Sequence, residues 1–102
     1  MAAFAQNRDA DQLARDARTS LSTASTERSR ALGSKDATYV LQQLNRILAE
    51  YERISTRLNN LTNRGVEINE SNLREIGRCG DSIQEFFNDV KRHHERLLMQ
   101  KQ

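Results

Sequence analysis

The sequence contains no proline and no tryptophan, and only four of its 102 residues are glycine. Because proline is the residue that most strongly breaks helices, its absence allows helices to run without interruption. Aromatic residues make up only 5% of the chain, whereas charged residues make up 29%. This composition favours an elongated helical protein over a compact β-sandwich or an α/β enzyme.

The chain also has a single cysteine and no long apolar run. One cysteine cannot form an internal disulfide, so we expect an intracellular, reducing location, with the cytoplasm as the default. The longest apolar runs have three or four residues, whereas a helix needs about 20 to span a bilayer. The first residues lack the basic and apolar regions of a secretory signal. The sequence therefore predicts a cytoplasmic protein with no integral membrane segment.

Charges of the two signs are nearly balanced, with sixteen Lys and Arg against fourteen Asp and Glu and a net charge of +2. No segment carries the concentrated positive charge that binds nucleic acid. The arginines of residues 46–64 alternate with glutamates, and aromatic residues for base stacking are scarce. We therefore interpret them as a solvated helix face and expect no nucleic-acid partner.

The strongest pattern in the sequence is an apolar heptad repeat over residues 36–64. Each of its eight a and d positions is apolar, which is typical of a coiled-coil seam. Position a falls on Ala37, Leu44, Tyr51 and Leu58, and position d falls on Val40, Ile47, Ile54 and Leu61. Asp36 is the predicted N-cap of this helix, and Gly65 the residue after its end.

A second heptad repeat predicts another helix over residues 70–100, with Asn69 as a candidate cap and Asn72 as the alternative. Its a and d positions are Leu73, Gly80, Phe87 and His94, and Ile76, Ile83, Val90 and Leu97. A connection of about five residues leaves no room for a crossover between the two helices. The sequence therefore predicts an all-α fold built on an antiparallel coiled-coil hairpin.

The first third of the chain differs from the rest. Of 26 residues that are Val, Ile, Leu, Met, Phe or Tyr, only five fall within residues 1–35. Alanines recur there at helical spacing over residues 8–31, but they bury little surface. We expect a weak helix or partly flexible arm over 1–35, followed by the hairpin domain over 36–102. This helix would complete a three-helix bundle, unless the hairpin builds an intermolecular bundle instead.

Apolar residues also flank the predicted hairpin seam. Leu41 and Leu48 occupy e positions, whereas Cys79 and Phe86 occupy g positions. Because e faces e and g faces g in an antiparallel pair, these residues flank opposite sides of the seam. A hairpin of two helices would leave the apolar residues of both flanks exposed to solvent. We therefore predict that these residues dock the N-terminal helix or another chain. The predicted partner-binding residues are Leu41, Leu48, Cys79, Phe86, Phe87, Leu97 and Leu98.

No group of residues has the spacing of a catalytic or metal site. His93 and His94 point apart on a helix and lack further ligands, so we interpret His93 as solvated and His94 as closing the seam. A nucleophilic Cys79 would need a base and an electropositive pocket, and the adjacent Arg78 does not share its helix face, so we expect a buried structural role. Gly77 and Gly80 weaken the helix that contains them, unless Ile54 or another helix fills the space. The sequence predicts no enzyme activity, no cofactor and no metal.

These observations favour a structural or adaptor subunit that binds protein helices, either copies of itself or a different coiled-coil subunit. A chaperone or targeting factor that shields a client's amphipathic helix is the alternative, together with a coiled-coil component of membrane-trafficking machinery. In each case the protein would act as an oligomer or as one subunit of a complex.

Overall fold

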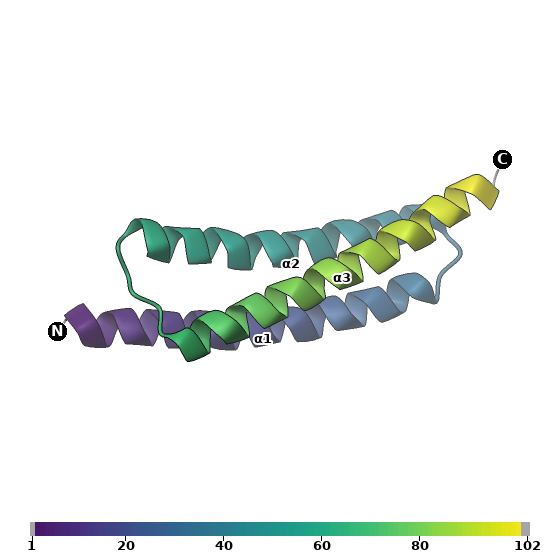
Figure 1. Cartoon of the computed structure of the whole chain (residues 1–102). Helices are drawn as coiled ribbons and strands as arrows, with labels where there is room; N and C mark the ends of the chain where they lie inside the picture. The colour runs from purple at the N-terminus through teal and green to yellow at the C-terminus, as the bar shows by residue number, and fades with distance from the viewer. Residues whose placement is uncertain (1, 101–102) are drawn as a thin grey trace.

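The computed structural model describes the backbone of residues 2–100 and the side chains of residues 8–100. Three helices, α1 (Ala2–Leu32), α2 (Ala37–Asn63) and α3 (Glu70–Gln100), pack against one another, and residues 2–100 contain no strand. The antiparallel hairpin of α2 and α3 is completed by α1, which runs antiparallel to α2 (Figure 1). The predicted all-α fold is thus confirmed in its three-helix form.

Asp36 determines where α2 begins. Its carboxylate accepts hydrogen bonds from the backbone N–H groups of Thr38 at 3.0 Å and Tyr39 at 3.4 Å. Both N–H groups lie in the first turn, where they have no partner within the helix. The cap therefore fixes the turn that separates α1 from the hairpin, as predicted.

The end of α2 forms a Schellman motif, in which two backbone N–H groups reach back into the last turn. Gly65 N–H donates to Thr62 and Val66 N–H donates to Leu61, each at 3.0 Å. Gly65 adopts a φ of 77°, a left-handed conformation that favours glycine. Val66 is buried in the same apolar cluster as Leu61. Asn69 then caps α3 by accepting a hydrogen bond from Asn72 N–H at 2.8 Å.

The N-terminal helix α1 is long and packs along the whole hairpin (Figure 1). Every seventh residue on its inner side is a buried alanine, and among its side chains from residue 8 onward Leu13 is the one that is large and fully buried. These alanines are Ala10, Ala17, Ala24 and Ala31. Small side chains let the α1 backbone lie close to the hairpin. The division into an arm over 1–35 and a hairpin domain over 36–102 stays a prediction, and residues 1, 101 and 102 lie outside the described residues.

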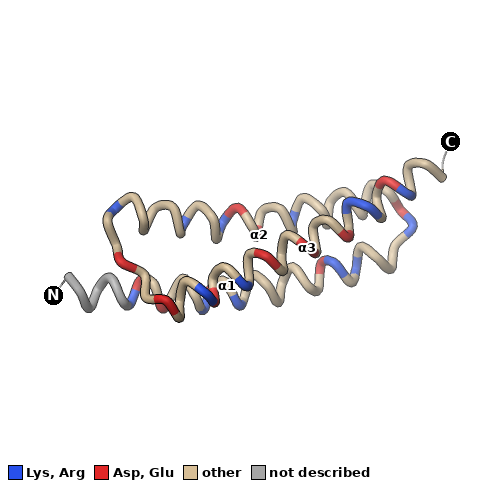
Figure 2. Tube along the Cα trace, viewed as in Figure 1, with Lys and Arg blue, Asp and Glu red and all other residues tan. Residues whose placement is uncertain are grey.

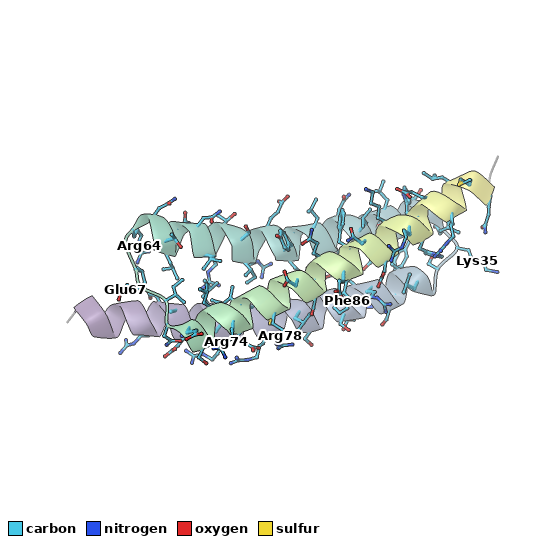
Figure 3. The ribbon with its side chains drawn as sticks, viewed as in Figure 1. Lys35, Arg64, Glu67, Arg74, Arg78 and Phe86 are labelled. Carbon is cyan, nitrogen blue, oxygen red and sulfur yellow. The ribbon has the colours of Figure 1, made fainter. Side chains whose placement is uncertain are left out.

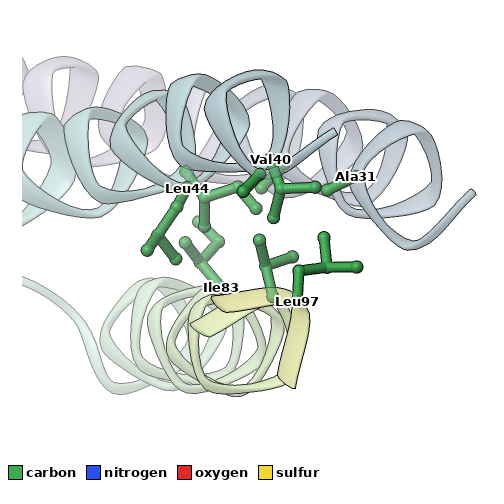
Figure 4. Close-up of a cluster of buried hydrophobic side chains, with 9 residues drawn as sticks. Ala31, Val40, Leu44, Ile83 and Leu97 are labelled. Atoms are coloured by element: carbon green, nitrogen blue, oxygen red, sulfur yellow. The ribbon is translucent and has the colours of Figure 1, made fainter. Parts of the chain in front are cut away.

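The core is centred on the d positions of the hairpin, all eight of which are buried. One apolar cluster, shown in Figure 4, lies toward the end that carries the α1–α2 connection, and a second lies toward the α2–α3 connection. In contrast, the a positions Tyr51, Leu58 and Phe87 are half-buried, and Leu73 is 50% exposed. A third helix on one flank draws the core toward that flank, so side chains on the other flank stay partly exposed.

Candidate protein-binding face between the second and third helices

One flank of the hairpin is covered by α1. The Cys79 side chain is completely buried in a cluster with Leu13, Ala14 and Ala17 of α1. Phe86 is half-buried on the same side of α3, with the Arg28 guanidinium 5.6 Å from its ring centroid (Figure 3). Cys79 and Phe86 therefore dock the N-terminal helix, which was one of the two occupants predicted for this flank.

Ion pairs reinforce this covered flank. Asp16 and Asp9 of α1 bind Arg57 and Arg64 of α2 at 2.5 and 3.3 Å. Two further pairs join α1 to α3, Arg28 with Asp89 at 3.0 Å and Arg18 with Glu75 at 3.7 Å. The hydrogen bond from Arg57 holds the pKa of Asp16 below its usual value. Among the side chains of residues 8–100, no ion pair joins α2 directly to α3.

The opposite flank of the hairpin has no covering helix. Leu41, Leu48 and Leu98 are exposed there by 41%, 37% and 45% of their surfaces. The half-buried ring of Phe87 lies beside Leu48. We call this flank the open face. It comprises Leu41, Leu48, Phe87, Leu98 and the residues that line its two hollows.

Both hollows of the open face lie in the groove between α2 and α3. The central hollow is lined by Leu48, Tyr51, Gln84, Phe87 and Asn88. The second, of about 130 Å³, exists where α3 has glycines in place of side chains. Its lining residues are Tyr51, Ile54, Ser55, Leu58, Ile76, Gly77, Gly80 and Asp81. We call it the glycine hollow.

The two glycines differ in their surroundings. A Cβ atom at Gly80 would lie 3.9 Å from the Tyr51 ring, whereas a Cβ atom at Gly77 would meet nothing within 4 Å. Tyr51 is thus the side chain nearest to Gly80, and Ile54, which the sequence suggested as a filler, lines the same hollow. The space beside Gly77 stays open within this chain.

The structure divides the seven predicted partner-binding residues into three groups. Leu41, Leu48, Phe87 and Leu98 lie on the open face, and Cys79 and Phe86 lie under α1. Leu97 is 6% exposed and belongs to the core near the α1–α2 connection, so neither it nor Cys79 is accessible to another chain in this state. Met99, which the heptad pattern does not single out, is 73% exposed beside Leu98.

Cys79 and His93 are the two side chains whose chemistry the sequence raised, and both lie in structural contacts. Burial raises the pKa of the Cys79 thiol, and Glu75 raises it further, which disfavours the nucleophilic thiolate. The His93 ring nitrogen Nε2 lies 2.7 Å from the Ser34 carbonyl oxygen. The interpretation of His93 as solvated was therefore wrong, because its ring holds the α1–α2 connection against α3. Within the described residues, no cluster of three His, Cys, Asp or Glu side chains is arranged to hold a metal.

The external charges are mixed in sign along all three helices, as Figure 2 shows. Within the described part of the chain, no helix combines the length and apolar character required to cross a bilayer. No protein-family model, curated protein sequence or solved structure matches this chain.

Proposed function

We propose that this chain is a non-enzymatic helical interaction module, a structural or adaptor subunit that assembles with other protein helices through its open face. The observation that carries the proposal is the asymmetry of the two hairpin flanks. Cys79 and Phe86 on one flank are covered by α1, whereas Leu41, Leu48 and Leu98 on the other remain exposed. Contiguous exposed apolar side chains in a groove are typical of protein-binding surfaces.

The shape of the open face suits a helical partner. The antiparallel helices α2 and α3 lie side by side and enclose a groove, which has two hollows at different positions along its length. Apolar side chains spaced by one heptad on a partner helix would insert into such hollows in the way that knobs fill holes in helical bundles. A groove of this width has no deep pocket of the kind that encloses a small-molecule substrate.

The test compares two neighbouring substitutions on α2. Leu48→Asp places a charge on the open face, whereas Ala49→Asp places the same charge on the exposed outer surface. Light scattering and sedimentation should show assembly of the wild type, alone or with a copurified chain, and loss of assembly only for Leu48→Asp. Circular dichroism should show unchanged helix content for both variants. Assembly that survives Leu48→Asp, or a wild type that assembles with nothing, would contradict the proposal.

One observation favours the chaperone alternative. The helix α1 contributes mainly alanines to the core, and it buries Glu27 with one carboxylate oxygen that has no hydrogen-bond partner. A helix held in this way is easier to displace than one anchored by leucines. A client helix that replaced α1 would expose Cys79. Faster alkylation of Cys79 in the complex would favour the chaperone function, whereas protection would favour binding at the open face.

A further inference from the structure

The two ends of the open face differ in shape. Toward the α1–α2 connection it presents the exposed side chains of Leu41 and Leu98. Toward the α2–α3 connection it presents the glycine hollow, where Gly77 has no neighbour on its outer side. If a second copy of this face is turned end over end, its projecting side chains lie over the hollow of the first copy. The face is therefore complementary in shape to an antiparallel copy of itself.

Leu48 lies midway between these two features. Leu41 precedes it by seven residues, and Ser55, which lines the glycine hollow, follows it by seven. At 1.5 Å per residue, each lies about 10 Å from Leu48 along the helix. Rotation about an axis through Leu48 therefore places Leu41 of one copy over the glycine hollow of another.

The charged residues beside the open face would also be complementary in an antiparallel pair of copies. Gln84 lies level with Leu48, because both line the central hollow. Glu95 lies eleven residues beyond Gln84 on α3, and Arg74 lies ten residues before it. In a reversed copy these opposite charges are neighbours, and Lys91 faces the glycine hollow, whose rim carries Asp81. Complementary charges of this kind select a register and an orientation.

We infer that the partner of the open face is a second copy of this chain, packed antiparallel about a two-fold axis that passes near Leu48 and Gln84. The helix α2 then packs on α2 of the partner, and α3 on its α3, which makes a four-helix layer with α1 outside on each copy. This inference rests on the proposed function, since it assigns an occupant to the same face.

A parallel two-fold dimer is disfavoured by charge. It would place α2 of one copy over α3 of the other at the same level. Glu52 would then oppose Asp81, because Tyr51 lies beside Gly80 on the neighbouring turn. Two carboxylates that face each other in a closed interface repel each other. Glu52 and Asp81 are both exposed, and among the described side chains neither forms an ion pair that would offset this repulsion.

The face is large enough for a stable dimer. The bundle measures 60 × 20 × 17 Å, so one side offers on the order of 1,000 Å², compared with the about 800 Å² per partner that stable interfaces bury. In an isologous dimer, each contact between two different residues occurs twice, once on each side of the two-fold axis. The central Leu48 therefore meets its own counterpart, and the Glu95–Arg74 contact occurs at both ends.

A charge exchange tests this geometry in the full chain. Glu95→Arg opposes two arginines, and Arg74→Glu opposes two glutamates, at both ends of the dimer. Each variant alone should therefore dissociate at least about tenfold more readily than the wild type. An equimolar mixture should recover wild-type affinity, because every contact then joins opposite charges. Sedimentation equilibrium measures all three, and Glu85→Arg, on an exposed position of α3, serves as the control.

Cysteine substitution provides a second, geometric readout. Leu48→Cys lies on the proposed axis and should form a disulfide-linked dimer under mild oxidation, whereas Leu41→Cys, which faces Ser55 of the partner, should not. The inference would be overturned if the two charge variants dimerised as strongly alone as in their mixture. It would also be overturned if Leu48→Cys and Leu41→Cys formed disulfide-linked dimers to the same extent. A wild type that stays monomeric but binds a different chain through Leu48 would overturn it too, while leaving the proposed function intact. Failure of both associations would contradict both.

Discussion

A buried acidic side chain in α1 makes the stability of the bundle depend on pH. Glu27 is only 5% exposed, and its Oε1 atom has no hydrogen-bond partner. Gln43 and Glu50 of α2 each also bury one acceptor oxygen without a partner. The ion pairs of Arg57 with Asp16 and of Arg64 with Asp9 set a register that places Glu27 between these two residues. This part of the α1–α2 interface therefore buries more hydrogen-bond acceptor oxygens than its hydrogen-bond donors satisfy.

Burial raises the pKa of Glu27 above its usual value of 4.5, and the nearby charge of Glu50 raises it further. Arg46 and Arg30 oppose this shift, but their effects are smaller. A carboxyl group with a raised pKa in the folded state favours folding most when it is protonated. Its contribution is therefore present below pH 4.5 and is lost as the pH rises through the pKa of the folded state.

Replacing Glu27 with glutamine should stabilise the bundle at neutral pH. The substitution removes the buried charge and supplies an N–H₂ donor in a region where Gln43 and Glu50 each bury an unpaired oxygen. An unsatisfied buried polar group costs about 1–3 kcal/mol, and in a domain of this size 1 kcal/mol changes the melting temperature by about 4–8 °C. We expect a gain of roughly 4–24 °C at pH 8 that shrinks toward pH 4.

Thermal unfolding followed by circular dichroism from pH 4 to 8 measures this difference. Glu85→Gln is the matched control, because Glu85 lies on the exposed surface of α3 and the same charge is removed there. Other carboxyl groups titrate in both proteins, so only the difference between variant and wild type reports on Glu27. A gain that is equal at pH 4 and pH 8, or a loss of stability at pH 8, would show that the buried charge of Glu27 does not destabilise the bundle.

Three further predictions concern capping, backbone and burial. Asp36→Ala removes the acceptor for Thr38 and Tyr39 N–H, so chemical denaturation should show a loss of about 0.5–2 kcal/mol, whereas Asp36→Asn should retain most of the stability. Gly77→Ala, which meets no neighbour, should raise the free energy of unfolding by about 1 kcal/mol, and the same change at Gly65, with its φ of 77°, should lower it. Cys79 should react with an alkylating reagent only at the rate at which the bundle opens, because its side chain is completely buried; rapid labelling of the folded protein would show that α1 does not cover it.

The hairpin could be predicted from the sequence because its signals are local and agree with one another. The heptads of residues 37–61 and 73–97, the cap at Asp36 and the glycine at position 65 each specify the same two helices. Side-chain contacts with the third helix were harder to anticipate. Heptad positions a and d describe a two-helix seam, whereas α1 moves the core toward the d positions and the covered flank. Leu73, predicted as core, is therefore 50% exposed.

The open face was predicted only in part, for a related reason. Leu41 and Leu48 stand out in the sequence because they are apolar at e positions. The glycine hollow does not, since a missing side chain gives no hydrophobic signal and Gly77 and Gly80 first suggest a weak helix. Which flank α1 would cover also depends on contacts between distant residues, such as Asp16 with Arg57. Those contacts have no spacing that a single sequence reveals.

The packing of α1 explains why an open face exists at all. Its acidic residues Asp9 and Asp16 pair with Arg64 and Arg57 on the flank of α2 that α1 covers. These ion pairs favour the placement of α1 on that flank. The alanines of α1 pack against the hairpin, whose d positions are buried, whereas Tyr51 and Phe87 stay half-buried and line the central hollow of the open face. The contacts that complete the core of one chain therefore also leave an apolar groove on its other side. A mutation that moved α1 to the opposite flank would remove the groove and, with it, the basis of the proposed assembly.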